Sequence, residues 1–211
     1  MIVGIVGGIA AGKSTVVAML VECGAEFIDA DSEAHRVLEQ QEVKAALVEW
    51  LGPQVVSTAG HVDRAQVAQK VFADPQALER LQGLVHPGVR RGIEQKVKEY
   101  RSRASSPMLV LDVPLLLESQ SLTKLCDKLV FIDANQHIRS SRVAARNWSA
   151  EELQRRESFQ IDIEEKRSRA DLTIDTSGTL DVTREQVKAC FNQLVGLGSG
   201  QNTTNSTAKN D

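Results

Sequence analysis

Short runs of apolar, largely β-branched residues recur along the chain, and each one ends in aspartate or is followed by glycine. The runs are Met1–Val6, Glu26–Asp29, Met108–Asp112, Leu129–Asp133 and Leu172–Asp175. Apolar runs of this length are typical of strands that are buried on both faces, as in a parallel sheet. The pattern therefore predicts a parallel sheet of five strands.

Helical spacing of apolar residues fills most of the sequence between these runs. It follows the first run directly in Ser14–Cys23, before the helix-terminating Gly24, and it returns in Asp181–Val195. Ser149 and Glu152 have the spacing of a capping box and predict a further helix start. Strands that alternate with helices predict an α/β fold of three layers, with helices on both faces of the sheet.

The segment 32–103 contains no predicted strand and keeps helical spacing throughout. Asp74 before Pro75 predicts one helix start, and His86 before Pro87 predicts another. Because this segment is too long for a simple crossover between two strands, we assign it to a separate helical lobe.

Composition and charge narrow the class of protein. The 211 residues include 25 Lys and Arg against 28 Asp and Glu, and 4% are aromatic, which argues against a protein that coats nucleic acid. The chain has no apolar stretch of about 18 residues, so no membrane span is expected. Its three scattered cysteines, Cys23, Cys126 and Cys190, predict reduced thiols and a cytoplasmic location. Residues 196–211 are mostly Gly, Ser, Thr and Asn, which predicts a disordered tail.

A phosphate-binding loop follows the first predicted strand. Residues 7–14, GGIAAGKS, match G-x-x-x-x-G-K-[ST] at every specified position, between a strand and a helix. The glycines let backbone N–H groups turn toward a phosphate at the helix N-terminus, and Lys13 adds a point charge on the β- and γ-phosphates. The predicted contacts with the phosphates of ATP are Gly8, Ile9, Ala10, Ala11, Gly12, Lys13, Ser14 and Thr15.

Ser14 and a carboxylate at a strand end are the candidate ligands of Mg²⁺. Asp112 and Asp133 both end apolar strands and compete for this role, and we favour Asp112. The loop assigns residues 1–31 and 104–195 to a P-loop core, with 32–103 as the helical lobe.

Further motifs resemble those of dephospho-CoA kinases, and they run in family order through most of the chain. They are GIVGGIAAGKST (4–15), FIDADSEAH (27–35), VDR (62–64), HP (86–87), DVPLLLE (112–118), RVAAR (142–146) and AD (170–171). The resemblance implies a nucleotide-kinase core, a helical CoA-binding insertion and a small helical lid within about 136–165. It also implies ATP- and Mg²⁺-dependent phosphorylation of the ribose 3′-hydroxyl of dephospho-CoA, the last step of coenzyme A synthesis.

The resemblance also implies roles for single residues. Asp31 is the carboxylate beside the acceptor hydroxyl and is suited to accept its proton. Asp29, two residues earlier at the end of the strand, is the alternative base, and we favour a structural role for it. Lys13, with Arg142 and Arg146 on one face of a lid helix, stabilises the transferring phosphoryl group. Arg64 and His86 are candidate acceptor contacts, and each is also compatible with an ordinary structural role.

Four residues depart from the family pattern. Ala10 and Ala11 replace a common Gly and Ser in the loop, Asn147 replaces an Asp after the second lid arginine, and Thr176 replaces an Asn near the expected adenine site. The expected partner is a small molecule, not nucleic acid or a membrane, and the expected state is a monomer or weak homo-oligomer. A nucleoside or nucleotide kinase with another acceptor and a P-loop switch without turnover remain as alternatives.

Overall fold

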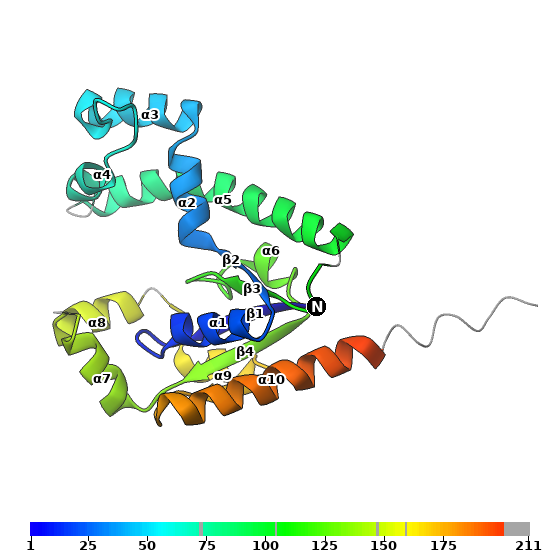
Figure 1. The fold of residues 1–211 in the computed structure, drawn as a ribbon. Coiled ribbons are helices and arrows are strands. Elements are labelled where there is room, and N and C mark those ends of the chain that lie inside the picture. Colours follow the sequence, from blue (N-terminus) through cyan, green and yellow to red (C-terminus); the bar gives the residue numbers. More distant parts are fainter. Residues whose placement is uncertain (72–73, 104, 147, 159, 201–211) are drawn as a thin grey trace, which may run out of the picture. The chain divides into compact units, whose positions relative to one another are not determined.

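The computed structural model describes residues 1–71, 74–103, 105–146, 148–158 and 160–200 (Figure 1). Its sheet has the strand order β2-β3-β1-β4-β5, and the β1–β3, β1–β4 and β4–β5 pairs are parallel. The strands are β1 (Ile2–Gly7), β2 (Glu26–Asp29), β3 (Leu109–Asp112), β4 (Lys128–Asp133) and β5 (Leu172–Asp175). All five predicted strands are confirmed, with ends that differ by one residue at most. The fully buried β1 lies at the centre of the sheet, so the loop that follows it emerges in the middle of the carboxyl edge, where open α/β sheets bind ligands.

Helices cover both faces of this sheet (Figure 1). On one face, α1 (Lys13–Glu22) and α10 (Leu180–Gly200) pack on inward-facing strand residues to form the main apolar core. The segment after β3, with the short α6 (Gln120–Thr123), covers the other face, where a Cβ on Gly4 would meet Leu116 at 2.5 Å. The segment predicted to be a lid, 136–165, contains α7 (Gln136–Ala144), α8 (Ala150–Glu157) and the start of α9 (Ile163–Ser168).

The helix boundaries test several sequence signals. Gly24 follows α1 with φ 103°, and the Ser149 hydroxyl caps α8 by accepting from the N–H of Glu152 at 3.1 Å, as predicted. The tail was predicted to begin at residue 196, but α10 continues to Gly200. A docked helix extends at little cost because its nucleus already exists. Residues 201–211 lie outside the described residues.

The chain divides into two compact units, Met1–Ile28 with Glu99–Asp211, and Asp29–Lys98. The second unit contains α2 (Ala30–Leu38), α3 (Gln41–Leu51), a short 3₁₀ turn (Pro53–Val55), α4 (Arg64–Val71) and most of α5 (Pro75–Arg103). It has its own apolar core, in which Val37, Leu47, Val55 and Val71 are fully buried. Apart from one antiparallel bridge between Val56 and Val62, its described residues form only helices and turns.

One of the two proline signals in this unit is confirmed and the other is wrong. Asp74 caps α5, whose first residue is Pro75. His86 and Pro87 do not begin a helix, since both lie inside α5. A proline inside a helix costs about 3 kcal/mol, and the burial of Val85 and Gly88 on either side of it provides packing that offsets this cost.

No helix within the described part of the chain combines the length and the apolar character needed to cross a membrane.

Candidate functional site

The loop between β1 and α1 is shaped by close approaches that only glycine permits. A Cβ on Gly7 would lie 2.5 Å from the carbonyl oxygen of Ile132 on β4. Gly12 precedes α1 with φ 92°, and a Cβ there would lie 3.2 Å from both Arg142 and Thr176. These two glycines fix how the loop leaves the sheet and enters the helix. The first turn of α1 therefore presents its unpaired N–H groups to the carboxyl edge of the sheet.

Ala10 has a left-handed backbone with φ 59°, and it is the one non-glycine residue with positive φ among the described residues. The conformation costs roughly 1 kcal/mol for an L-residue. The Ala10 side chain is buried with Ile9 and Val143, and Trp148 and Leu153 of the lid segment pack against them. This packing holds the loop in a conformation that alanine does not favour by itself.

Lys13 lies over the loop that precedes it. Its Nζ donates to the carbonyl oxygens of Gly7 and Gly8 at 3.2 and 2.9 Å. Burial and the nearby charge of Lys166 lower the pKa of Lys13 to about 8, although the Asp112 carboxylate acts in the opposite direction. A bound phosphate offers Lys13 a stronger, charged acceptor than these carbonyls.

Side chains from distant segments bind the other loop carbonyls. Arg139 on α7 donates its Nε–H to the oxygen of Ile9 at 3.0 Å, and Arg142 donates Nη1–H to the oxygen of Ala10 at 3.2 Å. The buried hydroxyl of Thr176, just after β5, donates to the oxygen of Ala11 at 2.6 Å and accepts from Arg142 at 3.0 Å. With Lys13, these side chains bind each carbonyl from Gly7 to Ala11.

A cavity of about 350 Å³ opens beside this loop. Its lining brings together predicted phosphate contacts, both predicted lid arginines and the segment after β5. The lining residues are Ala10, Gly12, Thr15, Arg142, Ala145, Arg146, Thr176, Gly178, Leu180 and Thr183.

The prediction that Arg142 and Arg146 share one helix is wrong, because α7 ends at Ala144. The N–H of Arg146 bonds to the carbonyl of Val143 at 3.0 Å, and the chain turns so that Trp148 can pack beside Val143. Both arginines nevertheless line the same cavity. Asn147 lies outside the described residues.

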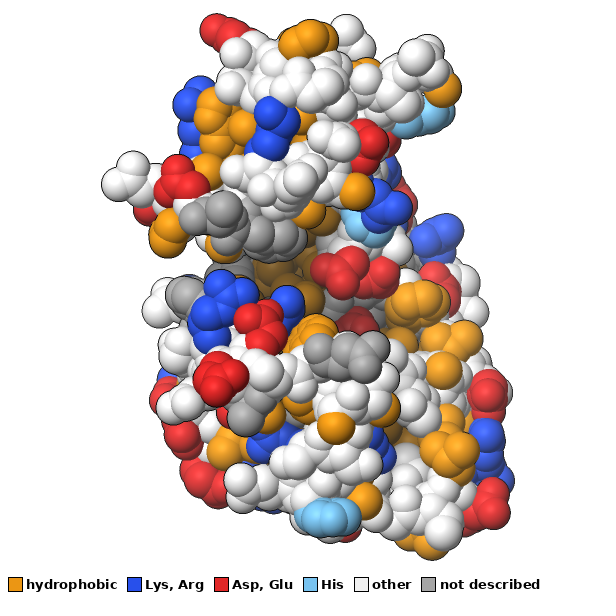
Figure 2. Space-filling view, turned by 90° about the vertical axis from the view of Figure 1, so that its left-hand side faces the viewer, with side chains coloured by type: hydrophobic (Ala, Val, Ile, Leu, Met, Phe, Trp, Pro, Cys, Tyr) orange, Lys and Arg blue, Asp and Glu red, His pale blue; other side chains and the backbone are white. Residues whose placement is uncertain are grey.

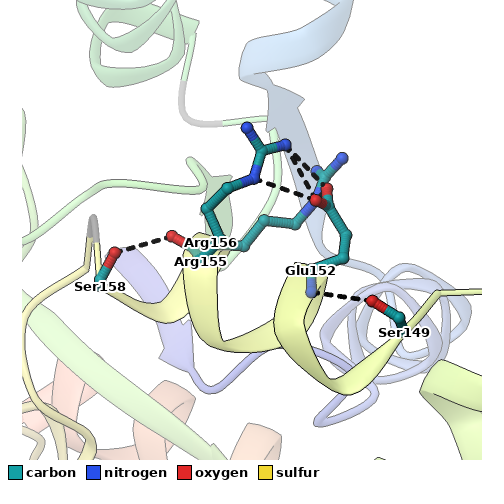
Figure 3. A network of polar contacts seen from close by, with 5 residues as sticks. All are labelled: Ser149, Glu152, Arg155, Arg156 and Ser158. Atoms are coloured by element: carbon teal, nitrogen blue, oxygen red, sulfur yellow. Dashed lines mark hydrogen bonds and ion pairs between the residues drawn. The ribbon is translucent and has the colours of Figure 1, made fainter.

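The second lid helix carries charges that bind one another. Figure 3 shows Arg155 and Arg156 on α8 with their guanidinium groups beside the carboxylate of Glu152, at Nε–O distances of 3.0 and 2.6 Å. Arg156 also lies over the ring of Trp148, 4.1 Å from its centre. These two arginines are thus paired with a carboxylate, whereas Arg142 donates to Ala10 and Thr176 and lines the cavity together with Arg146.

The structure distinguishes the two candidate metal carboxylates. Asp133 forms an ion pair with Arg167 at 2.8 Å. The Asp112 carboxylate lies close enough to Lys13 to oppose the lowering of the Lys13 pKa. The described residues contain no cluster of three His, Cys, Asp or Glu side chains that suits a metal ion. Ser14 and Asp112 fit Mg²⁺ in the manner of P-loop sites, since Mg²⁺ is usually bound through one or two protein oxygens together with phosphates and water.

The candidate acceptor residues lie in the helical unit. Asp29 caps α2 by accepting from the N–H groups of Asp31 and Ser32 at 2.9 and 3.2 Å, which supports its predicted structural role. The Asp31 carboxylate is exposed and has no hydrogen-bond or ion-pair partner within the described residues. Arg64, the first residue of α4, donates to the His35 ring on α2, whereas His86 is exposed in the middle of α5.

The sequence did not predict the contacts of Lys166 and Thr176 with the loop. Lys166 is 4% exposed and lines cavities on the loop, although its local sequence, IEEKRS, reads as an ordinary polar helix. Thr176 was noted as a departure near adenine, yet its hydroxyl binds the loop itself. No local pattern marks either contact.

Comparisons with known proteins agree on one family. The family profile for dephospho-CoA kinases matches residues 1–181. A dephospho-CoA kinase of Symbiobacterium thermophilum is 41% identical over 98% of this chain and 87% of its own length. Another, from Enterococcus faecalis, is 36% identical over 92% of this chain and 98% of its own length.

Solved structures show the same architecture. The protein TT1252 of Thermus thermophilus is 35% identical, with a TM-score of 0.70 over 92% of this chain and 97% of its own. Dephospho-CoA kinase from Campylobacter jejuni also has a TM-score of 0.70, with 23% identity and coverage of 92% and 96%. A shikimate kinase from Acinetobacter baumannii has a TM-score of 0.51 at 16% identity and coverage of 93% of each chain, a likeness of fold alone.

Proposed function

Because the chain belongs to the dephospho-CoA kinase family, it is a P-loop kinase of coenzyme A biosynthesis, and we propose that it phosphorylates the ribose 3′-hydroxyl of dephospho-CoA with ATP. The observation that carries the proposal is the family match through residue 181, and it is supported by the loop before α1, where Lys13 lies over the backbone of residues 7 and 8.

The loop residues Gly8 to Thr15 hold the nucleotide phosphates in this proposal. Their N–H groups and Lys13 bind non-bridging oxygens. The Ser14 hydroxyl and the Asp112 carboxylate would hold Mg²⁺, which would offset the negative charge of the phosphates. Arg142 and Arg146 face the cavity beside the loop, where guanidinium groups stabilise the phosphoryl group in transit.

Asp31 orients the acceptor and accepts its proton. As the 3′-oxygen forms a bond to the γ-phosphorus, the bond from that phosphorus to the β–γ bridging oxygen breaks. ADP keeps the bonding electrons and the hydroxyl proton goes to the Asp31 carboxylate. Arg64 and His86 contact the acceptor. The Asp31 carboxylate is exposed and has no partner within the described residues, which supports its role because such a carboxylate remains available to a substrate.

The decisive experiment incubates the purified chain with ATP, Mg²⁺ and dephospho-CoA and detects CoA by mass spectrometry. Nucleosides, nucleoside monophosphates and shikimate serve as competing acceptors. Conversion of dephospho-CoA alone supports the proposal. A chain that binds ATP but forms no CoA contradicts it, and preference for a nucleoside supports the alternative kinase.

The remaining properties proposed for the chain follow from its surface and cysteines. We propose a cytoplasmic monomer or weak homo-oligomer that does not bind nucleic acid. On the face drawn in Figure 2, Lys and Arg side chains are interspersed with Asp and Glu rather than gathered in one basic field. Cys23, Cys126 and Cys190 are free thiols, as expected of a protein in a reducing compartment.

A further inference from the structure

Lys166 is the one charged side chain buried in the unit that carries the loop, among its described residues. It lies on α9 and is 4% exposed. Its Nζ donates to the side-chain oxygen of Gln160 at 2.6 Å. The carboxylates of Glu118, Glu157 and Asp162 lie near enough to stabilise its charge, but within the described residues none forms an ion pair with its Nζ, so the direct partner of this buried ammonium is neutral.

Two cavities place the Lys166 side chain against the phosphate-binding loop. One, of about 10 Å³, has room for about one water molecule and is also lined by Gly7, Lys13 and Glu118. The other, of about 270 Å³, is also lined by Gly8 and by Arg139. Lys166 therefore shares one cavity beside the loop with Lys13 and the other with Arg139.

Charged side chains of both signs line these two cavities. Lys13, Arg139 and Lys166 contribute three cations, and Glu118, Glu157 and Asp162 contribute three carboxylates. Each carboxylate has another partner: Glu157 pairs with Arg139, Glu118 accepts from the N–H of Ile161 at 2.9 Å, and Asp162 accepts from the N–H of Glu164 at 2.8 Å. A phosphate oxygen would therefore be the direct anionic partner that Lys166 lacks within the described residues.

We propose that Lys166 donates a hydrogen bond to a non-bridging oxygen of the γ-phosphoryl group of ATP and stabilises that group during transfer. This inference rests on the proposed function for the identity of the transferred group. Lys166 keeps its protons throughout, while the acceptor oxygen bonds to the γ-phosphorus, the bond to the bridging oxygen breaks and ADP leaves with the electrons. Its contribution is electrostatic, as for other preorganised donors at transferring groups.

The test compares the binding of ATP and ADP by titration calorimetry in the presence of Mg²⁺. Lys166→Gln removes the charge and keeps a donor for Gln160, so we expect ATP to bind about tenfold or more weakly, with ADP affinity almost unchanged. Lys166→Arg restores the preference for ATP. The matched control is Lys128→Gln. Lys128 forms an ion pair with Asp171. It lies at the start of β4, at the opposite end of the β1–β4 ladder from Gly7.

Steady-state kinetics provide the second readout. We expect kcat of Lys166→Gln to fall by about 100-fold, with the KM for dephospho-CoA unchanged. Equal weakening of ATP and ADP, or an arginine variant no better than glutamine, overturns the proposal and leaves Lys166 with a structural role. If circular dichroism shows that Lys166→Gln does not fold, the ratio of the ATP and ADP affinities of Lys166→Arg decides. Lys166→Arg keeps the positive charge, so a folded Lys166→Arg variant that has lost the preference for ATP contradicts the proposal. Binding needs no acceptor, so a wild-type chain that binds ATP without forming CoA refutes the proposed function and not this contact.

Discussion

The surroundings of the phosphate-binding loop and the helical unit use their charged side chains differently. Around the loop, Lys13, Arg139 and Arg142 donate to backbone carbonyls of residues 7–10, although charges elsewhere in the same unit pair with one another, as Lys128 does with Asp171. In the helical unit, charges pair mainly with one another: the buried Glu33 binds Arg36 and Lys96, and the exposed Glu39 binds Lys44 and His61.

This difference shows which unit is preorganised for phosphate chemistry. A cation that holds a backbone carbonyl fixes the direction of the peptide and turns the N–H groups toward the ligand. An ion pair between helix side chains stabilises the fold of the helical unit, and its two charged groups bind each other instead of a ligand. The Asp31 carboxylate does not follow the pattern of paired charges, since it has no partner within the described residues, and the predictions below test both patterns.

Asp31→Asn carries the largest expected effect. We expect kcat to fall by about 100-fold or more, since the hydroxyl loses its proton acceptor, and the Kd for ATP to stay within about twofold of the wild-type value because the loop is untouched. Stopped assays of CoA formation and calorimetry measure the two quantities. Asp29→Asn is the control, because Asn caps helices as well as Asp does. Equal loss of turnover and ATP affinity would assign Asp31 a structural role.

Glu33→Gln tests the paired charges of the helical unit. The Glu33 side chain is 1% exposed, and hydrogen bonds from Lys96 and Arg36 hold its pKa below the usual value against the opposing effect of burial. We expect urea unfolding to show a loss of about 2 kcal/mol with ATP affinity unchanged. Glu39→Gln, in an exposed pair, should change stability much less. A variant that loses ATP affinity and keeps its stability would contradict the division between the units.

Thr176→Val tests the binding of the loop carbonyls. Valine keeps the shape but removes the donor to Ala11 and the acceptor for Arg142. We expect the KM for ATP to rise about tenfold, with stability lowered by about 1 kcal/mol. Thr173→Val, at an exposed position of β5, is the control. No change in the KM for ATP would show that the loop holds its shape without this hydroxyl.

The lowered pKa of Lys13 predicts a pH dependence of ATP binding. A pKa of about 8 in the free protein leaves Lys13 largely charged at pH 7 and largely neutral at pH 9. Bound phosphate favours the charged form, so ATP binding should take up protons near pH 8, and affinity should fall as the pH rises through 8. Calorimetry in buffers of different ionisation enthalpy measures the uptake. Lys13→Arg should abolish it, because arginine stays charged, and uptake that persists in this variant would assign it to another group.

Ala10→Gly carries the smallest expected effect. Glycine relieves the left-handed backbone at φ 59°, but it loses a buried methyl group and gains entropy in the unfolded chain. We expect thermal unfolding to shift by less than about 1 kcal/mol in free energy, with ATP still bound. Ala10→Val should destabilise clearly more, because a β-branched residue tolerates positive φ poorly. A large loss of stability in Ala10→Gly would show that the methyl contact with Val143 outweighs the strain.

Local signals explain the successes of sequence analysis. Apolar runs located the five strands, and Asp74 with Pro75 located the start of α5, because these signals act within a few residues. The second proline signal at Pro87 failed, since packing of α5 within the helical unit outweighs the local penalty. One motif was enough to predict the candidate loop residues, but a motif does not indicate which distant side chains bind the loop carbonyls.

By itself, the sequence determined the fold class, the position of the phosphate-binding loop and the resemblance to one kinase family, because each is written in contiguous residues. Only the tertiary structure decided that Arg142 and Thr176 bind the loop from 132 and 165 residues away. It alone placed Lys166 in the buried space beside the loop. Such contacts depend on how strands and helices pack, and packing joins residues that no local pattern connects.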